Sequence, residues 1–202
     1  GFYIYKNDYA LPMGFTFDTY VSRSQWETYS ESDRCNLLLR ALVLEDDAVE
    51  TYQKDMQKLP DAVHQMSDED LLAECTERAK TACDSFTYNS KGFHATISTD
   101  HANLVFFSVP WEEGWSAEVN GEPVAIEKAD IGFMAVPVAA GDSEITFTYH
   151  TPGLKAGALL SLGGLVLFAG YLTVAGIYNK RHPNPKTESI CCVDYSTEET
   201  AN

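Results

Sequence analysis

Residues 156–178 form one uninterrupted apolar segment without a charged side chain (AGALLSLGGLVLFAGYLTVAGIY). A helix rises about 1.5 Å per residue, so about 20 apolar residues cross the roughly 30 Å hydrocarbon core of a bilayer. A long polar, acidic stretch precedes the segment, which excludes a signal peptide. The sequence therefore predicts a transmembrane helix over residues 154–179. The alternative is a core helix of a larger soluble protein, but the flanking charges and the lack of a polar face favour the membrane.

The basic residues beside this segment predict its orientation. One lysine precedes it closely and three basic residues follow it: Lys155, then Lys180, Arg181 and Lys186. Positive residues next to a membrane helix stay on the cytoplasmic side. We therefore expect residues 180–202 to form a cytoplasmic tail and residues 1–153 to form an extracytoplasmic domain. The last predicted strand ends about eight residues before the apolar segment, so the domain is expected to be held close to the lipid bilayer.

The charge of the chain excludes some classes of partner. The formal net charge is −16, and nearly all of it lies before the apolar segment. Such a surface repels nucleic acid and anionic lipid headgroups, so no nucleic-acid partner is expected. It does not identify a partner of its own, and a solvated acidic surface explains it equally well.

Five cysteines do not form a disulfide framework under this topology. Cys191 and Cys192 belong to the predicted cytoplasmic tail, whereas Cys35, Cys75 and Cys83 lie outside. Three external cysteines allow one bridge at most, and whether Cys75 or Cys83 pairs with Cys35 stays open. No cysteine or histidine spacing suggests a metal site, and no cofactor is expected.

The first half of the predicted domain combines a strand with helices. Residues 14–21 alternate with the period of a strand, and residues 23–85 form a helical segment. The first helix begins at an N-cap in residues 30–33, and its apolar positions are expected to be Leu37, Leu38, Ala41, Leu42 and Leu44. The acidic residues 45–47 are expected to end it. A second helix is expected from Ser67 to about residue 82, with acids in its first turn.

Residues 86–150 show the pattern of short strands separated by turns. Residues 93–98, 103–109, 115–119, 133–136 and 144–149 are apolar or alternating, and Asn120-Gly121 is a strong hairpin signal. This spacing predicts an antiparallel β-sandwich-like structure. The predicted fold class is therefore α+β: a sandwich-like extracytoplasmic domain with a helical segment, followed by one C-terminal transmembrane helix.

Two tryptophans and two acids are the candidate carbohydrate-binding residues. Trp111 and Trp115 flank a turn that contains Glu112 and Glu113. Aromatic faces stack on sugar rings, and carboxylates accept hydrogen bonds from hydroxyl groups. The alternative is that both tryptophans only pack in the sandwich. Adjacent acids do not face one bond, and no nucleophile–base motif or metal spacing is found, so no catalytic residue is assigned.

Small residues in the predicted membrane helix indicate packing against other helices. Gly153, Gly157, Ser161 and Gly164 place small side chains at close spacing. Small-xxx-small spacing favours close helix contacts in membranes, although glycine is also simply tolerated there. The chain starts with Gly1 and shows no earlier span, so we expect it to be the C-terminal part of a longer polytopic protein.

Several segments, in the same order, resemble the YfhO-type family of bacterial membrane proteins. The resemblance is carried by residues 7–15 (NDYALPMGF), 37–44 (LLLRALVL), 108–124 (SVPWEEGWSAEVNGEPV), 133–141 (FMAVPVAAG) and 145–149 (ITFTY). The acidic segment 45–85 and the Cys-Cys tail have no counterpart in the family pattern.

The resemblance implies a function that the residues alone do not reveal. YfhO-type proteins resemble multi-span glycosyltransferases of the GT-C class, which use polyprenyl-phosphate sugars to modify cell-envelope polymers such as teichoic acid. The resemblance therefore implies a bacterial plasma membrane, an accessory role for this region, the remaining membrane core as partner, and cell-envelope polysaccharide as a possible ligand. The catalytic acids of that class lie in a core that this chain lacks, so none is transferred here. Alternatives are a non-enzymatic single-span surface protein that binds polysaccharide or a partner protein, and a self-contained hydrolase.

Overall fold

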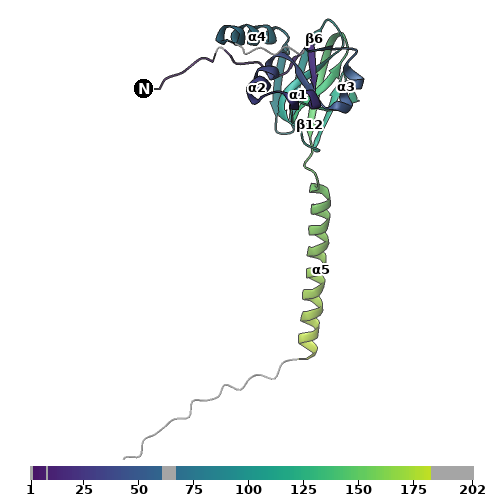
Figure 1. The fold of residues 1–202 in the computed structure, drawn as a ribbon. Coiled ribbons are helices and arrows are strands. Elements are labelled where there is room, and N and C mark those ends of the chain that lie inside the picture. The colour runs from purple at the N-terminus through teal and green to yellow at the C-terminus, as the bar shows by residue number, and fades with distance from the viewer. Residues whose placement is uncertain (1, 8, 61–66, 183–202) are drawn as a thin grey trace, which may run out of the picture. The chain divides into compact units, whose positions relative to one another are not determined.

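A computed structural model describes residues 2–7, 9–60 and 67–182. The expectations for Lys186, Cys191 and Cys192 lie outside the described residues. The chain divides after Pro152 into two units, a mixed α+β domain and a segment that contains one long helix. Each unit is described separately (Figure 1).

Two β-sheets form the framework of the domain. The seven-stranded sheet has the order β1-β7-β11-β10-β3-β2-β4 and the five-stranded sheet has the order β5-β6-β12-β8-β9. The strands of the first sheet are β1 (Phe15–Thr16), β2 (Thr19–Ser22), β3 (Leu42–Leu44), β4 (Gln57–Lys58), β7 (Asn103–Pro110), β10 (Glu127–Ala129) and β11 (Phe133–Val138). Those of the second are β5 (Ser85–Asn89), β6 (Gly92–Thr99), β8 (Trp115–Val119), β9 (Glu122–Val124) and β12 (Gly141–Tyr149).

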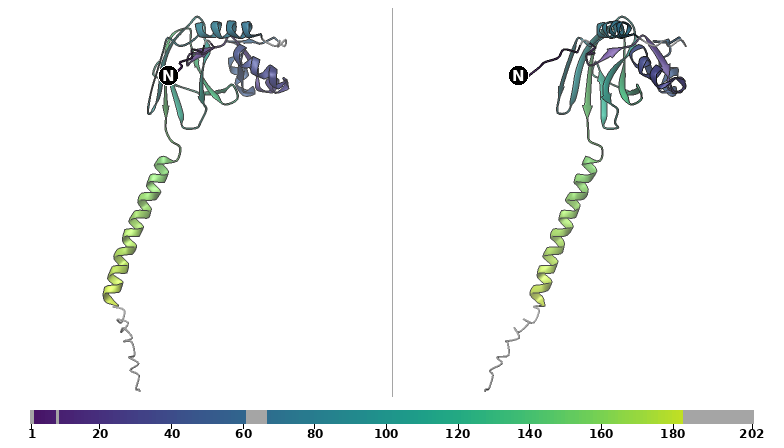
Figure 2. Two further views of the ribbon diagram at one scale, coloured as in Figure 1. Left: turned by 90° about the vertical axis from the view of Figure 1, so that its left-hand side faces the viewer. Right: turned by 60° about the vertical axis from the view of Figure 1, so that its left-hand side comes forward.

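Four helices accompany the sheets in the domain. They are α1 (Arg23–Thr28), α2 (Glu31–Arg40), α3 (Asp46–Tyr52) and α4 (Asp68–Lys80). Helix α4 lies across the end of the sandwich opposite to the end at which β12 leaves it (Figure 2). The buried Arg78 fastens α4 to the framework, because its Nη1 donates to the Thr16 carbonyl at 2.6 Å and its guanidinium lies 4.4 Å from the Phe17 ring centroid.

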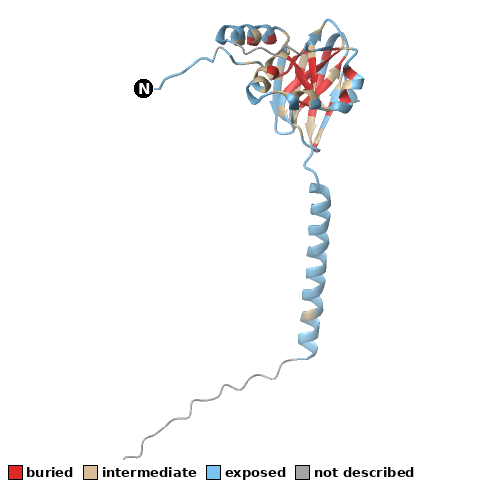
Figure 3. Ribbon diagram, viewed as in Figure 1, coloured by how far each residue is buried: buried red, intermediate tan, exposed pale blue. Residues whose placement is uncertain are grey.

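The apolar core has two parts, one on each face of the seven-stranded sheet. Val105 and Phe107 of β7 pack with β6, β8 and β12 in the space between the sheets. Leu104 and Phe106 of the same strand point to the other face and pack against residues of β2, β3 and α3. A strand that is covered on both faces is apolar without alternation, which explains the continuous run of β7. The buried residues accordingly concentrate in the strands (Figure 3).

The sequence-based fold class is confirmed. The structure is mixed α+β with sandwich-like antiparallel sheets and a C-terminal apolar helix of membrane-span length. The seven-stranded sheet also contains two parallel pairs, β2 with β3 and β2 with β4. The Asn120-Gly121 hairpin has positive φ at both residues (54° and 80°), and Ser67 forms a capping box with Asp70 at the start of α4.

Part of the predicted helical segment is wrong. The first helix ends at Arg40, and Leu42–Leu44 form the fully buried strand β3. Pairing with β2 and β10 makes this segment a strand, since residues buried on both faces of a sheet lack the alternation that identifies strands. The acids 45–47 begin α3 instead of ending a helix, where they suit the helix dipole. The predicted strand 14–21 is interrupted between β1 and β2.

The second unit contains helix α5 (Leu154–Arg181). Within the described residues it is the one helix that is long and apolar enough to cross a membrane. Gly153 is the N-cap of α5 and has a left-handed φ of 76°, a backbone conformation that glycine adopts without steric penalty. Gly157, Ser161 and Gly164 lie within α5 and are exposed, and their role in helix packing stays a prediction.

Candidate functional site

The segment between β7 and β8 separates the two predicted sugar-binding tryptophans. Strand β7 belongs to the seven-stranded sheet and β8 to the five-stranded sheet, so residues 111–114 cross between the sheets. Trp111 stays with the first sheet, where its backbone N–H donates to the Gly132 carbonyl at 2.8 Å. Trp115 begins β8 and pairs with Tyr149 of β12. Each tryptophan therefore lines a different pocket.

The Trp115 pocket is an apolar cavity of about 600 Å³ at one end of the sandwich. Its apolar walls come from Met13, Phe86, Tyr88, Phe93, Trp115 and Tyr149. The Trp115 ring lies 5.0 Å from that of Tyr149 and 5.7 Å from that of Phe93, measured between centroids. Lys91 and Glu112 contribute one charge of each sign to the wall.

Glu112 and Tyr149 are joined across the rim of this pocket. The Tyr149 hydroxyl donates to Glu112 Oε2 at 2.7 Å, and this hydrogen bond to a carboxylate raises the pKa of Tyr149. Gly114 allows the contact, because a Cβ at this buried position would lie 2.6 Å from both the Tyr149 ring and the His150 carbonyl oxygen. The carboxylate of Glu112 is therefore a positioned group, whereas the adjacent Glu113 is exposed and lines neither tryptophan pocket.

The Trp111 pocket is smaller, about 340 Å³, and more polar. Its lining residues are Glu45, Asp47, Trp111, Ile126, Glu127 and Lys128. The Lys128 ammonium lies 4.2 Å from the Trp111 ring centroid, a cation–π contact on one face of the indole. Glu127 accepts a hydrogen bond from the Tyr52 hydroxyl at 2.9 Å, and burial together with this carboxylate raises the pKa of Tyr52. The pocket thus combines an aromatic face with three carboxylates and one ammonium group.

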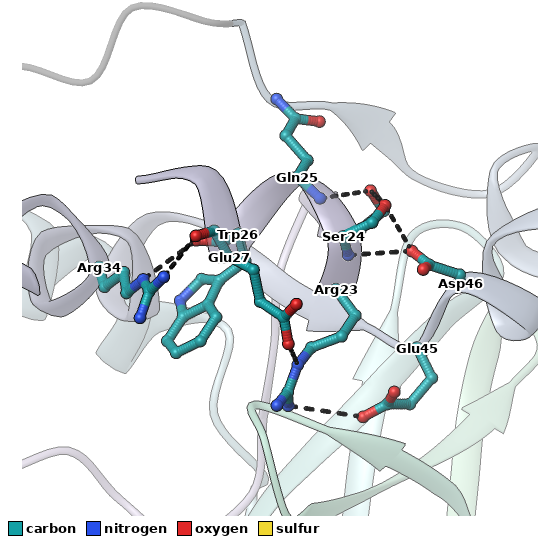
Figure 4. Close-up of polar contacts among 9 residues, drawn as sticks. Arg23, Ser24, Gln25, Trp26, Glu27, Arg34, Glu45 and Asp46 are labelled. Atoms are coloured by element: carbon teal, nitrogen blue, oxygen red, sulfur yellow. Dashed lines mark hydrogen bonds and ion pairs between the residues drawn. The ribbon is translucent and has the colours of Figure 1, made fainter. Parts of the chain in front are cut away.

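A network between α1 and the start of α3 positions the acidic side of the Trp111 pocket (Figure 4). Arg23 pairs with Glu27 at 2.9 Å and with Glu45 at 3.8 Å. The backbone N–H and the hydroxyl of Ser24 both donate to Asp46 Oδ1, at 3.1 and 2.9 Å. These contacts tie the N-terminal turn of α3 to α1, so Glu45 is held at the mouth of the pocket.

Trp26, the third tryptophan, is a structural residue that sequence reasoning missed. Its ring lies between two guanidinium groups, with centroid distances of 5.4 Å to Arg23 and 4.5 Å to Arg34. Arg34 also donates to the carbonyls of Trp26 and Glu27, which closes the C-terminal end of α1 (Figure 4). Tyr29 and Ser30 interrupt the helix between α1 and α2, so no helical spacing indicated the contact between Trp26 and Arg34.

The histidine, cysteine, aspartate and glutamate side chains in the described part of the chain do not gather into a metal site. No group of three or more histidine, cysteine, aspartate or glutamate side chains there is arranged to hold a metal ion. Cys35, Cys75 and Cys83 are free thiols in this structure, and burial raises the pKa of Cys83 to about 11. Because α4 ends at Lys80, Cys83 does not share a helix with Cys75.

Asp130 is the one buried carboxyl group among the described residues, and it supports the Trp111 side. It occupies the β10–β11 turn with a left-handed φ of 44°, and its Oδ1 accepts the Val43 N–H at 2.8 Å. Burial raises its pKa to about 7, although the hydrogen bond from Val43 opposes this shift. The same turn presents the Gly132 carbonyl to Trp111.

These features define a general class of protein: a membrane protein in which a β-rich sandwich-like domain is joined to a helix of membrane-span length. Residues 61–161 match the model of the family described as "Bacterial membrane protein YfhO", and the chain belongs to this family. Over 121 residues the chain is 30% identical to the "Uncharacterized protein YfhO" of Bacillus subtilis (strain 168). That match covers 60% of this chain and 13% of the relative, so the chain spans a small part of that protein's length. No solved structure matches this chain.

Proposed function

We propose that this chain is the extracytoplasmic accessory region and a membrane span of a YfhO-type glycosyltransferase. The domain holds a cell-envelope polymer, such as teichoic acid, near an active site in other spans that uses polyprenyl-phosphate sugars. Support comes from family membership, from the small share of the relative that the chain covers, and from Lys180 and Arg181, which lie in the last turn of α5 and favour a cytoplasmic C-terminal side.

The Trp111 pocket is the observation that carries this proposal. The half-buried Trp111 indole lines the pocket beside Lys128, and a sugar ring would stack on its accessible part. The carboxylates of Glu45, Asp47 and Glu127 accept hydrogen bonds from hydroxyl groups, and Lys128 supplies a cation for a neighbouring phosphate. A polymer repeat with hydroxyl groups beside a phosphate therefore matches the chemistry of the pocket.

A binding experiment tests the proposal. The detergent-solubilised chain is titrated with purified wall teichoic acid, and its affinity is compared with that of Trp111→Ala. We expect about a tenfold loss, because removal of an aromatic anchor costs about 1.4 kcal/mol or more. Tyr88→Ala, which removes an aromatic residue from the other pocket, is the matched control and should bind normally. Equal affinity of Trp111→Ala and the unaltered chain would refute polymer binding at this pocket.

A second measurement tests the accessory role itself. The same preparation is incubated with teichoic acid and undecaprenyl-phosphate-linked glucose, and transferred sugar is measured. We expect no turnover, because the proposal places the catalytic residues in other spans of the longer protein. Turnover by this chain alone would show that it is an enzyme in its own right.

A further inference from the structure

We propose that the Trp115 pocket is a docking surface for the lipids of the membrane that α5 crosses. The inference does not depend on polymer binding, because it concerns the other pocket and rests on the membrane helix. The occupant is the interfacial part of the bilayer, where lipid glycerol groups and the first acyl carbons meet the headgroups.

The walls of the pocket have the composition of a membrane-interface surface. Trp115 and Tyr149 are half-buried, and Tyr88 is 82% exposed. Tyrosine and tryptophan are enriched at the level of lipid headgroups, because an apolar ring carries a polar tip there. An exposed aromatic cluster of this kind in a soluble setting would be costly, whereas an adjacent bilayer covers it.

The strand directions bring this pocket to the end of the domain from which the chain continues to α5. Strands β5, β7 and β12 end at this pocket, and β6 and β8 begin there. Tyr149, a lining residue, is the last residue of β12, and α5 begins at Leu154. Five residues of extended chain span at most about 18 Å. The pocket is therefore tethered within reach of the interfacial layer by the covalent chain alone.

Charge decides how the contact is made. The chain carries a net charge of −16, which repels anionic headgroups. Lys91, on the β5–β6 turn, is a cation in the wall of the pocket and can meet a lipid phosphate. Docking is thus driven by burial of aromatic surface with a local contribution from Lys91, and it should persist at high salt, where surface charge is screened.

Fluorescence quenching by brominated lipids tests this docking surface. The full chain is reconstituted in phosphatidylcholine vesicles whose acyl chains carry bromine near the glycerol. One variant retains Trp115 alone (Trp26→Phe, Trp111→Phe) and the matched control retains Trp111 alone (Trp26→Phe, Trp115→Phe). Circular dichroism confirms that both variants fold. We expect Trp115 to be quenched at least about threefold more strongly than Trp111, since quenching requires contact at the interface.

Two further changes sharpen the result. Tyr88→Ala with Lys91→Glu, added to the variant that retains Trp115, should reduce its quenching, whereas Glu113→Gln should not. Equal quenching of Trp111 and Trp115 would overturn the proposal, as would loss of Trp115 quenching at high salt. A third outcome also refutes lipid docking. If neither brominated lipid nor aqueous iodide quenches the fluorescence of Trp115, protein covers the pocket.

Discussion

The two tryptophan pockets are close in sequence and differ in almost every physical property. The Trp115 pocket is built from strand ends of the sandwich, is rich in aromatic rings, and contains one charge of each sign. The Trp111 pocket depends on α3 and β10, contains three carboxylates, and has a lysine over its indole. Three residues separate the two indoles, but those residues cross from one sheet to the other. Side-chain neighbours are therefore set by sheet membership rather than by distance along the chain.

Gly92→Ala, which disturbs the strands around the Trp115 pocket, should have the largest effect on the free energy of unfolding. A Cβ at Gly92 would lie 1.9 Å from the Phe147 carbonyl oxygen, so the β6–β12 pairing must shift. We expect a loss of about 3 kcal/mol or more in the free energy of unfolding, which denaturant titration measures. Ser90→Ala, at an exposed position in the adjacent turn, should change stability by less than about 0.5 kcal/mol. Similar stabilities of the two variants would show that the sandwich end tolerates the added methyl group.

Asp130→Asn, in the turn that supports the Trp111 pocket, should alter how the free energy of unfolding depends on pH. The folded-state pKa is raised from 3.8 to about 7, so the folded chain keeps a proton that the unfolded chain loses. The stability that protonated Asp130 contributes to the folded chain is fully present below about pH 4. As the pH rises, this contribution falls by up to about 1.4 kcal/mol per pH unit, and above about pH 7 it no longer changes.

Unfolding titrations at pH 5 and pH 7 measure this difference. The unaltered chain should lose about 2 kcal/mol relative to Asp130→Asn between these values, since an asparagine cannot ionise. Parallel pH profiles of the two proteins would mean that Asp130 does not titrate in this window.

Lys128→Gln gives the smallest expected change and concerns only the Trp111 pocket. Removal of the cation–π contact should cost about 0.5–1 kcal/mol of stability at this exposed site. The emission of Trp111 should shift, while that of Trp115 should not, in variants that each retain one of these tryptophans. Lys128→Arg, which keeps the cation over the ring, is the control. A shift in Trp115 emission would show that the two pockets are coupled.

The sequence predicted the parts of the fold that local chemistry determines. The apolar segment 156–178 lies within α5, the Asn120-Gly121 turn has the positive φ angles of a hairpin, and Ser67 caps α4. These features depend on a few adjacent residues. The helix predicted through Leu42 and Leu44 was wrong because these residues continue the helical spacing of Leu37, Leu38 and Ala41, and only pairing with β2 and β10 makes them a strand.

The candidate site was predicted in composition but not in arrangement. Trp111, Trp115 and Glu112 do line pockets, yet their partners Tyr149, Lys128 and Glu45 come from distant segments. Trp26 between two arginines carried no sequence signal, since Arg34 reaches it from the next helix. Such contacts depend on how the two sheets and α3 pack, and a single sequence does not contain that information in a local pattern.

The strand that leads to α5 is a central strand, and this has a mechanical meaning. Strand β12 pairs with β6 over residues 141–148 and with β8 over residues 145–149. Tension that is applied along β12 loads both hydrogen-bond ladders in shear at once. An edge strand would instead peel away one hydrogen bond at a time. The domain is attached at the point where its five-stranded sheet best resists being pulled apart.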